Sequence, residues 1–173
     1  GQYNYRKAIA SVNHWFSIGV WGWMRYRVEA GKIWGTLPFP LLELHPGNES
    51  FYYDDLAFNT MNFFEFVSDQ YAQLHVTHHF DGFFLNKIPL IRKLKLREVA
   101  SFNILWGSLD KKHEREMLLL PEMHRLTIPY AEATIGIENI FKVLRVDAIW
   151  RMTYLDHENI AKFGIRFKFD VDF

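Results

Sequence analysis

The sequence predicts an all-β protein whose strands are long, antiparallel and chemically different on their two faces. From Phe163 to Phe173 every odd position is apolar, and every even position is polar or glycine. A period of two is typical of an extended strand with one apolar and one polar face. Strands of soluble sheets usually have about five or six residues, whereas a strand that crosses a bilayer needs about nine to eleven. The closing segment is long enough to cross a bilayer, but taken alone it fits an ordinary strand of a soluble sheet better, so the interpretation depends on whether the rest of the chain repeats the pattern.

The composition excludes several classes of protein. Twenty basic residues balance 20 acidic ones, so net charge gives no reason to expect a nucleic-acid partner. The chain of 173 residues has no cysteine, which excludes a disulfide scaffold and a thiol nucleophile. No apolar run approaches the roughly 18 to 20 residues of a transmembrane helix. The 16 Phe, eight Tyr and six Trp residues suit a protein with aromatic side chains at the lipid–water interface.

Two strands are expected first, over Tyr5 to Ser17 and Met24 to Ala30, with a tight turn around Gly19. The alternation of apolar and polar residues stops between Thr36 and Asp55, where prolines and a glycine prevent regular β-ladder hydrogen bonding. A connection of about twenty residues is usually functional or disordered. This one is too apolar for disorder, so we expect it to pack against the inside of a barrel.

Two interpretations apply to the residues that follow. In one, Phe58 to Val67 and Tyr71 to Asp81 form a hairpin across residues 68–70. In the other, the whole of Thr36 to Gln70 is one external loop that folds into the lumen of the barrel, and we favour this interpretation.

The rest of the chain contains four more strands and two connections. Phe83 to Leu94 is a connector with one or two helical turns, and a long loop ends at Pro129. The expected strands are Lys95 to Gly107, Tyr130 to Glu138, Leu144 to Leu155 and the terminal segment. Seven or eight strands result.

Charged residues of the last strands lie on one face; they are Arg145, Asp147, Arg151, Arg166 and Lys168. In water, the opposite face would be a large aggregating patch. An antiparallel transmembrane β-barrel of outer-membrane type, with its polar face inside, satisfies both the backbone and the alternation. Long connections then fall on the outer side and short turns on the periplasmic side. A soluble lipocalin-like barrel, which has the reverse faces, is the structural alternative.

The run Gly136 to Arg151, followed by the closing segment, resembles the carboxyl end of the BamA/TamA/FhaC superfamily, whose barrels insert or translocate proteins. The chain is more closely similar to an uncharacterised Bacteroidetes outer-membrane family, whose members often carry a carboxypeptidase-regulatory-like domain ahead of the barrel. Residues 30–35, 37–55 and 64–69 and the closing segment carry this similarity. It implies that residues 1–173 are the C-terminal part of a larger barrel, and that residues 36–70 are the loop that occupies the lumen.

The resemblance also implies two sets of functional residues. The assembly signal would be Phe163, Ile165, Phe167, Phe169, Val171 and Phe173. The tip of the lumen loop would be His45, Pro46, Gly47, Asn48 and Glu49. The superfamily has an Arg-Gly-Phe/Tyr tip, whereas this sequence has no arginine between Gly35 and Ser68.

We therefore expect an integral protein of the bacterial outer membrane, which acts in outer-membrane protein assembly or translocation or as a component of an outer-membrane complex. A passive pore or transporter-type barrel is the first alternative, and a soluble ligand-binding barrel is the second. Expected partners are outer-membrane lipids, the barrel-assembly machinery, and other outer-membrane proteins or lipoproteins, without nucleic acid.

We expect no enzymatic activity, no cofactor and no metal site. His75 and His79 share a strand face but lie about 13 Å apart along it. Ser50 and Ser68 lack the sharp turn of a nucleophile elbow, and nothing pairs Asp54 or Asp55 with a catalytic base.

Overall fold

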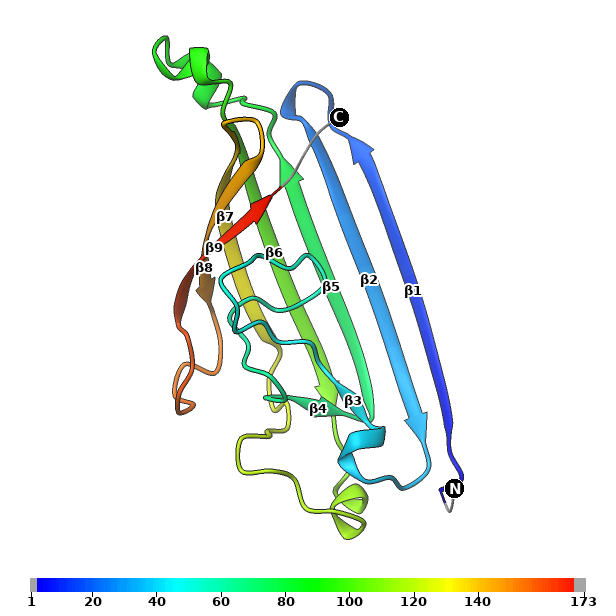
Figure 1. Cartoon of the computed structure of the whole chain (residues 1–173). Coiled ribbons are helices and arrows are strands. Elements are labelled where there is room, and N and C mark those ends of the chain that lie inside the picture. The colour runs from blue at the N-terminus through cyan, green and yellow to red at the C-terminus, as the bar shows by residue number, and fades with distance from the viewer. Residues whose placement is uncertain (1–2, 170–173) are drawn as a thin grey trace.

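The computed structural model of the protein describes residues 3–169. It is centred on a seven-stranded antiparallel sheet in the order β1-β2-β5-β6-β7-β8-β9, and a short second sheet pairs β3 with β4 (Figure 1). The strands are β1 (Arg6–Ser17), β2 (Trp23–Trp34), β3 (Glu43–Leu44), β4 (Val67–Ser68), β5 (Gln70–His79), β6 (Arg97–Ser108), β7 (Tyr130–Ile140), β8 (Leu144–Arg151) and β9 (Phe163–Phe169). The prediction of an all-β antiparallel protein is confirmed.

Helical structure in residues 3–169 is limited to five short 3₁₀ segments. They are η1 (Gly19–Trp21), η2 (Phe39–Leu41), η3 (Leu85–Lys87), η4 (Ile91–Leu94) and η5 (Lys111–Arg115). The helical turns predicted between Phe83 and Leu94 are therefore confirmed by η3 and η4. Within the described part of the chain, no helix has the length and apolar character needed to cross a membrane.

The main sheet is open, because β1 and β9 are its two edges rather than neighbours. Two strands end earlier than predicted. β5 stops at His79 because Asp81 and Gly82 have positive φ and turn the chain away. β8 stops at Arg151, since Tyr154 has a φ of 54° and its ring joins a buried cluster instead of continuing the ladder.

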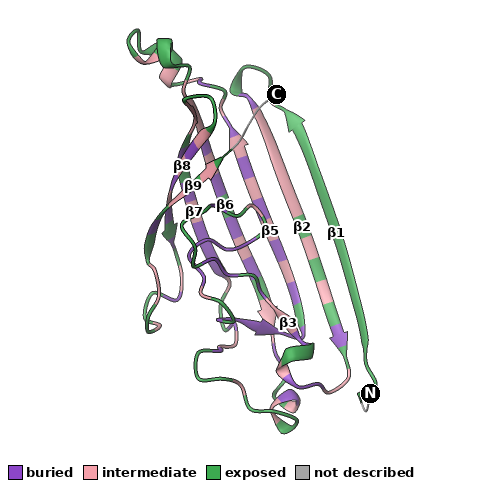
Figure 2. Cartoon of the chain, viewed as in Figure 1, coloured by how far each residue is buried: buried purple, intermediate pink, exposed green. Residues whose placement is uncertain are grey.

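The two faces of the sheet are the reverse of those in a soluble sheet. Along β6, Ser101 and Asn103 are buried, while Phe102 and Trp106 are exposed. On β7, Glu132 is fully buried, whereas Ile135 on the other face is 63% exposed. Figure 2 shows the same alternation along β5. On β5 to β7, polar side chains thus point toward covering protein and apolar side chains point away from it, whereas β1 is exposed on both faces.

Residues 35–69 provide most of that cover. They connect β2 to β5, which are direct neighbours, and they lie across the polar face of the sheet (Figure 1). The interpretation in which Phe58 to Val67 forms one arm of a hairpin is wrong, because within that span only Val67 belongs to a strand, where it pairs with Leu44. The reason lies in its apolar side chains, which do not alternate between two faces: Phe58, Met61 and Phe66 are fully buried, whereas the adjacent Phe63 and Phe64 are both exposed.

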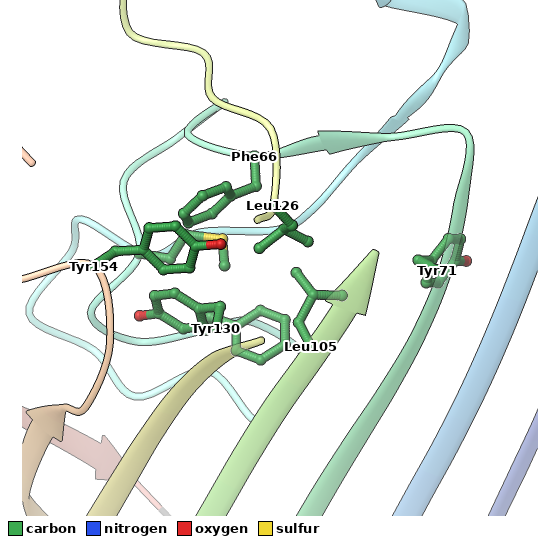
Figure 3. Close-up of a cluster of buried hydrophobic side chains, with 8 residues drawn as sticks. Phe66, Tyr71, Leu105, Leu126, Tyr130 and Tyr154 are labelled. Carbon is green, nitrogen blue, oxygen red and sulfur yellow. The ribbon is translucent and has the colours of Figure 1, made fainter. Parts of the chain in front are cut away.

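Two apolar clusters hold this connection in place. The larger one joins it to β5, β6 and β7 and to residues that follow β8 (Figure 3): Phe58, Met61, Phe66, Tyr71, Leu105, Leu126, Tyr130 and Tyr154. The smaller cluster consists of Ile33, Leu37, Leu42, Val67 and Leu109. Residues 35–69, 109–129 and 152–162 all leave the sheet at the same end, while the short turns at 18–22 and 141–143 and the longer connection at 80–96 lie at the other (Figure 1).

Candidate functional site: a loop anchored on the polar face

The docked loop, by which we mean residues 35–69, is anchored on β7 by one buried carboxylate. Glu132 accepts the backbone N–H groups of Asn59 at 2.8 Å and Thr60 at 2.9 Å. It also accepts the Thr60 hydroxyl at 2.8 Å and the Asn103 side-chain amide at 3.0 Å. A buried carboxylate is costly unless its oxygens are hydrogen-bonded. The loop therefore supplies most of the donors that make Glu132 tolerable inside the protein.

A second anchor is a buried ion pair between the loop and β8. The Arg151 guanidinium donates to both Glu65 carboxylate oxygens, with 2.9 Å between Nη1 and Oε2. Arg151 also donates to the carbonyls of Thr60 and Thr153 and lies over the Tyr130 ring. Burial alone would raise the pKa of Glu65, but the hydrogen bonds from Arg151 and the Asn62 backbone outweigh it and lower that pKa. The carboxylate is held in its charged form.

The third set of anchors comes from β9 and β2. Arg166 donates to the carbonyls of Asn48 and Asn59, at 3.3 and 3.0 Å. Lys168 pairs with Asp55 at 2.7 Å, and Arg25 lies 3.3 Å from the same carboxylate. Burial opposes ionisation of Asp55, but its pKa is nevertheless lowered because Lys168 and Arg25 favour the charged form. Opposite charges thus meet across the loop–sheet interface.

Of the predicted tip residues of the loop, His45, Gly47 and Asn48 are buried, while Pro46 and Glu49 are exposed. Buried His45 bonds the Ser68 hydroxyl at 2.9 Å. Asn48 donates to Asn59 Oδ1 at 2.7 Å and to the Tyr52 carbonyl at 2.6 Å. Burial lowers the pKa of His45 to about 3, with nearby Glu29 opposing the shift, so the imidazole is neutral at pH 7.

The other three tip residues set the path of the backbone. The Pro46 carbonyl accepts the Phe58 N–H at 2.9 Å, and Glu49 accepts the Phe63 N–H at 2.9 Å. Gly47 lies so close to the facing segment of the loop that a Cβ at this position would be 2.3 Å from the Asn62 carbonyl oxygen. Only glycine fits without displacing that backbone.

Four residues of the predicted assembly signal lie on the exposed apolar face of β9: Phe163, Ile165, Phe167 and Phe169. Val171 and Phe173 lie outside the described residues. The role of this segment as a signal stays a prediction.

Sequence reasoning identified the charged face of the last strands but missed the main anchors contributed by β7 and the loop. Glu132 and Glu65 were not singled out. Glu132 could have been found from the alternation of its strand, because a carboxylate between two apolar neighbours lies on the polar face. Nothing in the local sequence indicated that its partners are Asn59 and Thr60, more than 70 positions away.

Two of the histidines on β5, His78 and His79, have hydrogen-bond partners, and His78 bonds the Trp21 carbonyl at 2.8 Å. His79 bonds Glu138 at 2.9 Å and stacks on Trp23, with ring centroids 3.9 Å apart. Within residues 3–169 no group of three or more His, Asp or Glu side chains is arranged to hold a metal ion.

The fold and site together define a β-sheet protein with an apolar outer face and a long loop anchored to a polar inner face. The chain belongs to a family whose function is not known: the profile described as "Family of unknown function (DUF5686) C-terminal domain" matches residues 1–117. That range includes β1 to β6 and the docked loop. A search of curated proteins and a search of solved structures each returned no match.

Proposed function

We propose that the protein is an integral β-barrel protein of the bacterial outer membrane, and that this chain forms the C-terminal part of the barrel. The observation that carries the proposal is the reversed burial of the sheet. Its exposed face carries large apolar side chains on six of the seven strands, all but β5, among them Val12, Val28, Phe102, Ile135, Trp150 and Phe167. Soluble monomers rarely expose contiguous apolar patches beyond about 300–600 Å². A lipid environment covers such a face and matches its alternation.

The two sheet edges support a larger barrel. Each neighbouring pair in the sheet is antiparallel, so β1 and β9, the first and last of seven strands, run in the same direction. Unpaired backbone groups in hydrocarbon cost several kcal/mol each, which is why membrane sheets are closed. Closure with antiparallel pairs requires an odd number of further strands between β9 and β1. Strands from elsewhere in a longer protein meet that requirement, while direct closure of this sheet on itself does not.

We further propose that the barrel acts in the assembly or translocation of outer-membrane proteins, in line with its resemblance to the BamA/TamA/FhaC superfamily. The docked loop supports this role, since a long loop held against the polar face corresponds in position to the lumen loop of that superfamily. The charges are distributed in the opposite way, however. Here the sheet supplies the arginines, Arg151 and Arg166, and the loop supplies Glu65 and main-chain carbonyls.

A passive pore or transporter-type barrel is the second candidate. The docked loop covers the polar face that would line such a pore, so this candidate requires the loop to leave. A soluble lipocalin-like barrel has less support, because its covered face would have to be apolar where this protein carries Glu132, Asp147 and Arg151.

Two measurements test the proposal. The intact protein should fractionate with outer membranes and require detergent for extraction; stability in plain buffer would contradict the membrane assignment. Its conductance in planar bilayers should rise when residues 37–55 are deleted. Loss of outer-membrane protein biogenesis on depletion supports an assembly role, whereas normal biogenesis together with a large steady pore in the intact protein favours the second candidate.

A further inference from the structure

The outward edge of β9 is partly occupied by the docked loop. The Tyr53 N–H donates to the Phe167 carbonyl at 2.7 Å, and the Phe167 N–H donates to the Phe51 carbonyl at 2.9 Å. Tyr52 and Phe167 thus form a parallel bridge. We call residues 51–53 the strap. Because β8 occupies the other edge of β9, the strap lies where a further strand of the sheet would pair.

The strap also continues the two-faced pattern of the sheet. Tyr52 is 48% exposed, and its ring lies 6.3 Å from the Phe169 ring, on the apolar outer side. Tyr53 points the other way, is buried, and lies under the Arg145 guanidinium at 4.7 Å. This segment therefore matches β9 in side-chain direction as well as in backbone pairing.

A continuous series of hydrogen bonds links the strap to the anchor on β7. Glu132 accepts the N–H of Asn59, and Asn59 Oδ1 accepts the Asn48 side-chain amide. That same amide group of Asn48 donates to the Tyr52 carbonyl at 2.6 Å. Glu132 thus positions the strap through Asn59 and Asn48, although it contacts neither the strap nor β9 in this series.

We propose that the strap is a releasable cap on the edge of β9, and that it leaves this edge when the docked loop separates from Glu132. The inference rests on the proposed function, in which β9 is a membrane strand whose edge must be paired. The backbone pairing of the cap is a single bridge, flanked by the side-chain bonds of Arg166 and Lys168 to the loop, whereas β8 and β9 share seven residue pairs. Release of the loop therefore exposes the β9 edge without breaking the main sheet.

Disulfide trapping tests the coupling between Glu132 and the strap, since residues 1–173 contain no cysteine. In the full-length protein in nanodiscs, the pair Tyr52→Cys and Phe167→Cys should cross-link under mild oxidant. Adding Glu132→Ala should slow cross-linking about tenfold or more, as expected for loss of a hydrogen-bonded charged anchor. The matched control is Glu138→Ala on the same strand, which bonds His79 rather than the loop and should leave the rate unchanged.

A second pair of variants keeps the test decisive if Glu132→Ala fails to fold. Asn48→Ala removes the link to Tyr52 and should slow cross-linking, whereas Asn62→Ala, whose side chain bonds the Asn159 carbonyl, should not. Equal rates for Asn48→Ala and the parent, or no cross-link in the parent, would overturn the proposal. Failure of the membrane assignment is separate, because it appears in fractionation and not in the cross-linking rates.

Discussion

Replacing Arg151 with methionine should strongly destabilise the docked loop. The substitution keeps an unbranched side chain but removes the guanidinium that donates to both oxygens of Glu65. Glu65 is only 3% exposed, so its charge would remain buried with the Asn62 N–H and His157 as its remaining partners. Removing one member of a buried ion pair typically costs about 3–5 kcal/mol. We expect a loss in this range for Arg151→Met at pH 7.

The pH dependence separates loss of the ion pair from loss of packing. In the parent protein the pKa of Glu65 is lowered, so its contribution to stability is complete above the ordinary carboxyl pKa of 4.5. That contribution declines as the pH falls through the lowered pKa of the folded protein. In Arg151→Met the lowering by Arg151 is absent, and protonation of Glu65 relieves the buried charge. The difference in stability between the two proteins should therefore shrink on acidification.

The assay is urea unfolding of the full-length protein in lipid vesicles, with protection of residues 58–66 from proteolysis as a separate measure of loop docking. The double variant Glu65→Gln with Arg151→Met is the control, because removing both charges of a buried pair is often nearly neutral. A loss below about 1 kcal/mol for Arg151→Met, or a double variant no more stable than the single one, would refute this account of the anchor.

Three further predictions concern the loop and the outer face. The pKa of His45 is lowered to about 3 in the docked loop, so the undocked loop binds a proton first, and docking should weaken by up to about 1.4 kcal/mol per pH unit as the pH falls from 6.5 toward about 4.5. Proteolysis of the loop against pH should show this slope in the parent and a smaller one in His45→Gln. Gly47→Ala should destabilise the protein by about 1–3 kcal/mol in urea unfolding, since its Cβ would overlap the Asn62 carbonyl, and an unchanged midpoint would contradict that geometry. Ile135→Arg should cost about 2–4 kcal/mol in vesicles if its position is near the bilayer midplane, whereas a neutral effect would mean that this side chain meets water.

The sequence predicted the strands well where alternation is regular. From Phe163 to Phe169 the apolar and polar positions fall on opposite faces as expected, and Arg145 and Asp147 are buried on the polar face. Local periodicity is sufficient in such segments because each side chain direction follows from its neighbours. The ends of β5 and β8 were less predictable, since they depend on positive φ values and on the packing of Tyr154.

The anchors of the loop could not be predicted from local pattern. Glu132 bonds Asn59 and Thr60 over a separation of more than 70 residues, and Arg151 bonds Glu65 over 86. Such pairs depend on the path that the loop takes across the sheet. The positions of proline and glycine limit this path but do not determine it. The strap was missed for the same reason, because one bridge between Tyr52 and Phe167 leaves no periodic signal in the sequence.

Lipid exposure of β9, measured residue by residue, tests the central claim most directly. Single cysteines at positions 164–168 of the full-length protein in vesicles would carry a spin label, and its accessibility to oxygen and to a water-soluble relaxant would be compared. We predict high oxygen accessibility at Ile165 and Phe167 and low values at Arg166 and Lys168, with a period of two. Labels at Ile165 and Phe167 that are reached mainly by the water-soluble relaxant would contradict the assignment of this face to lipid.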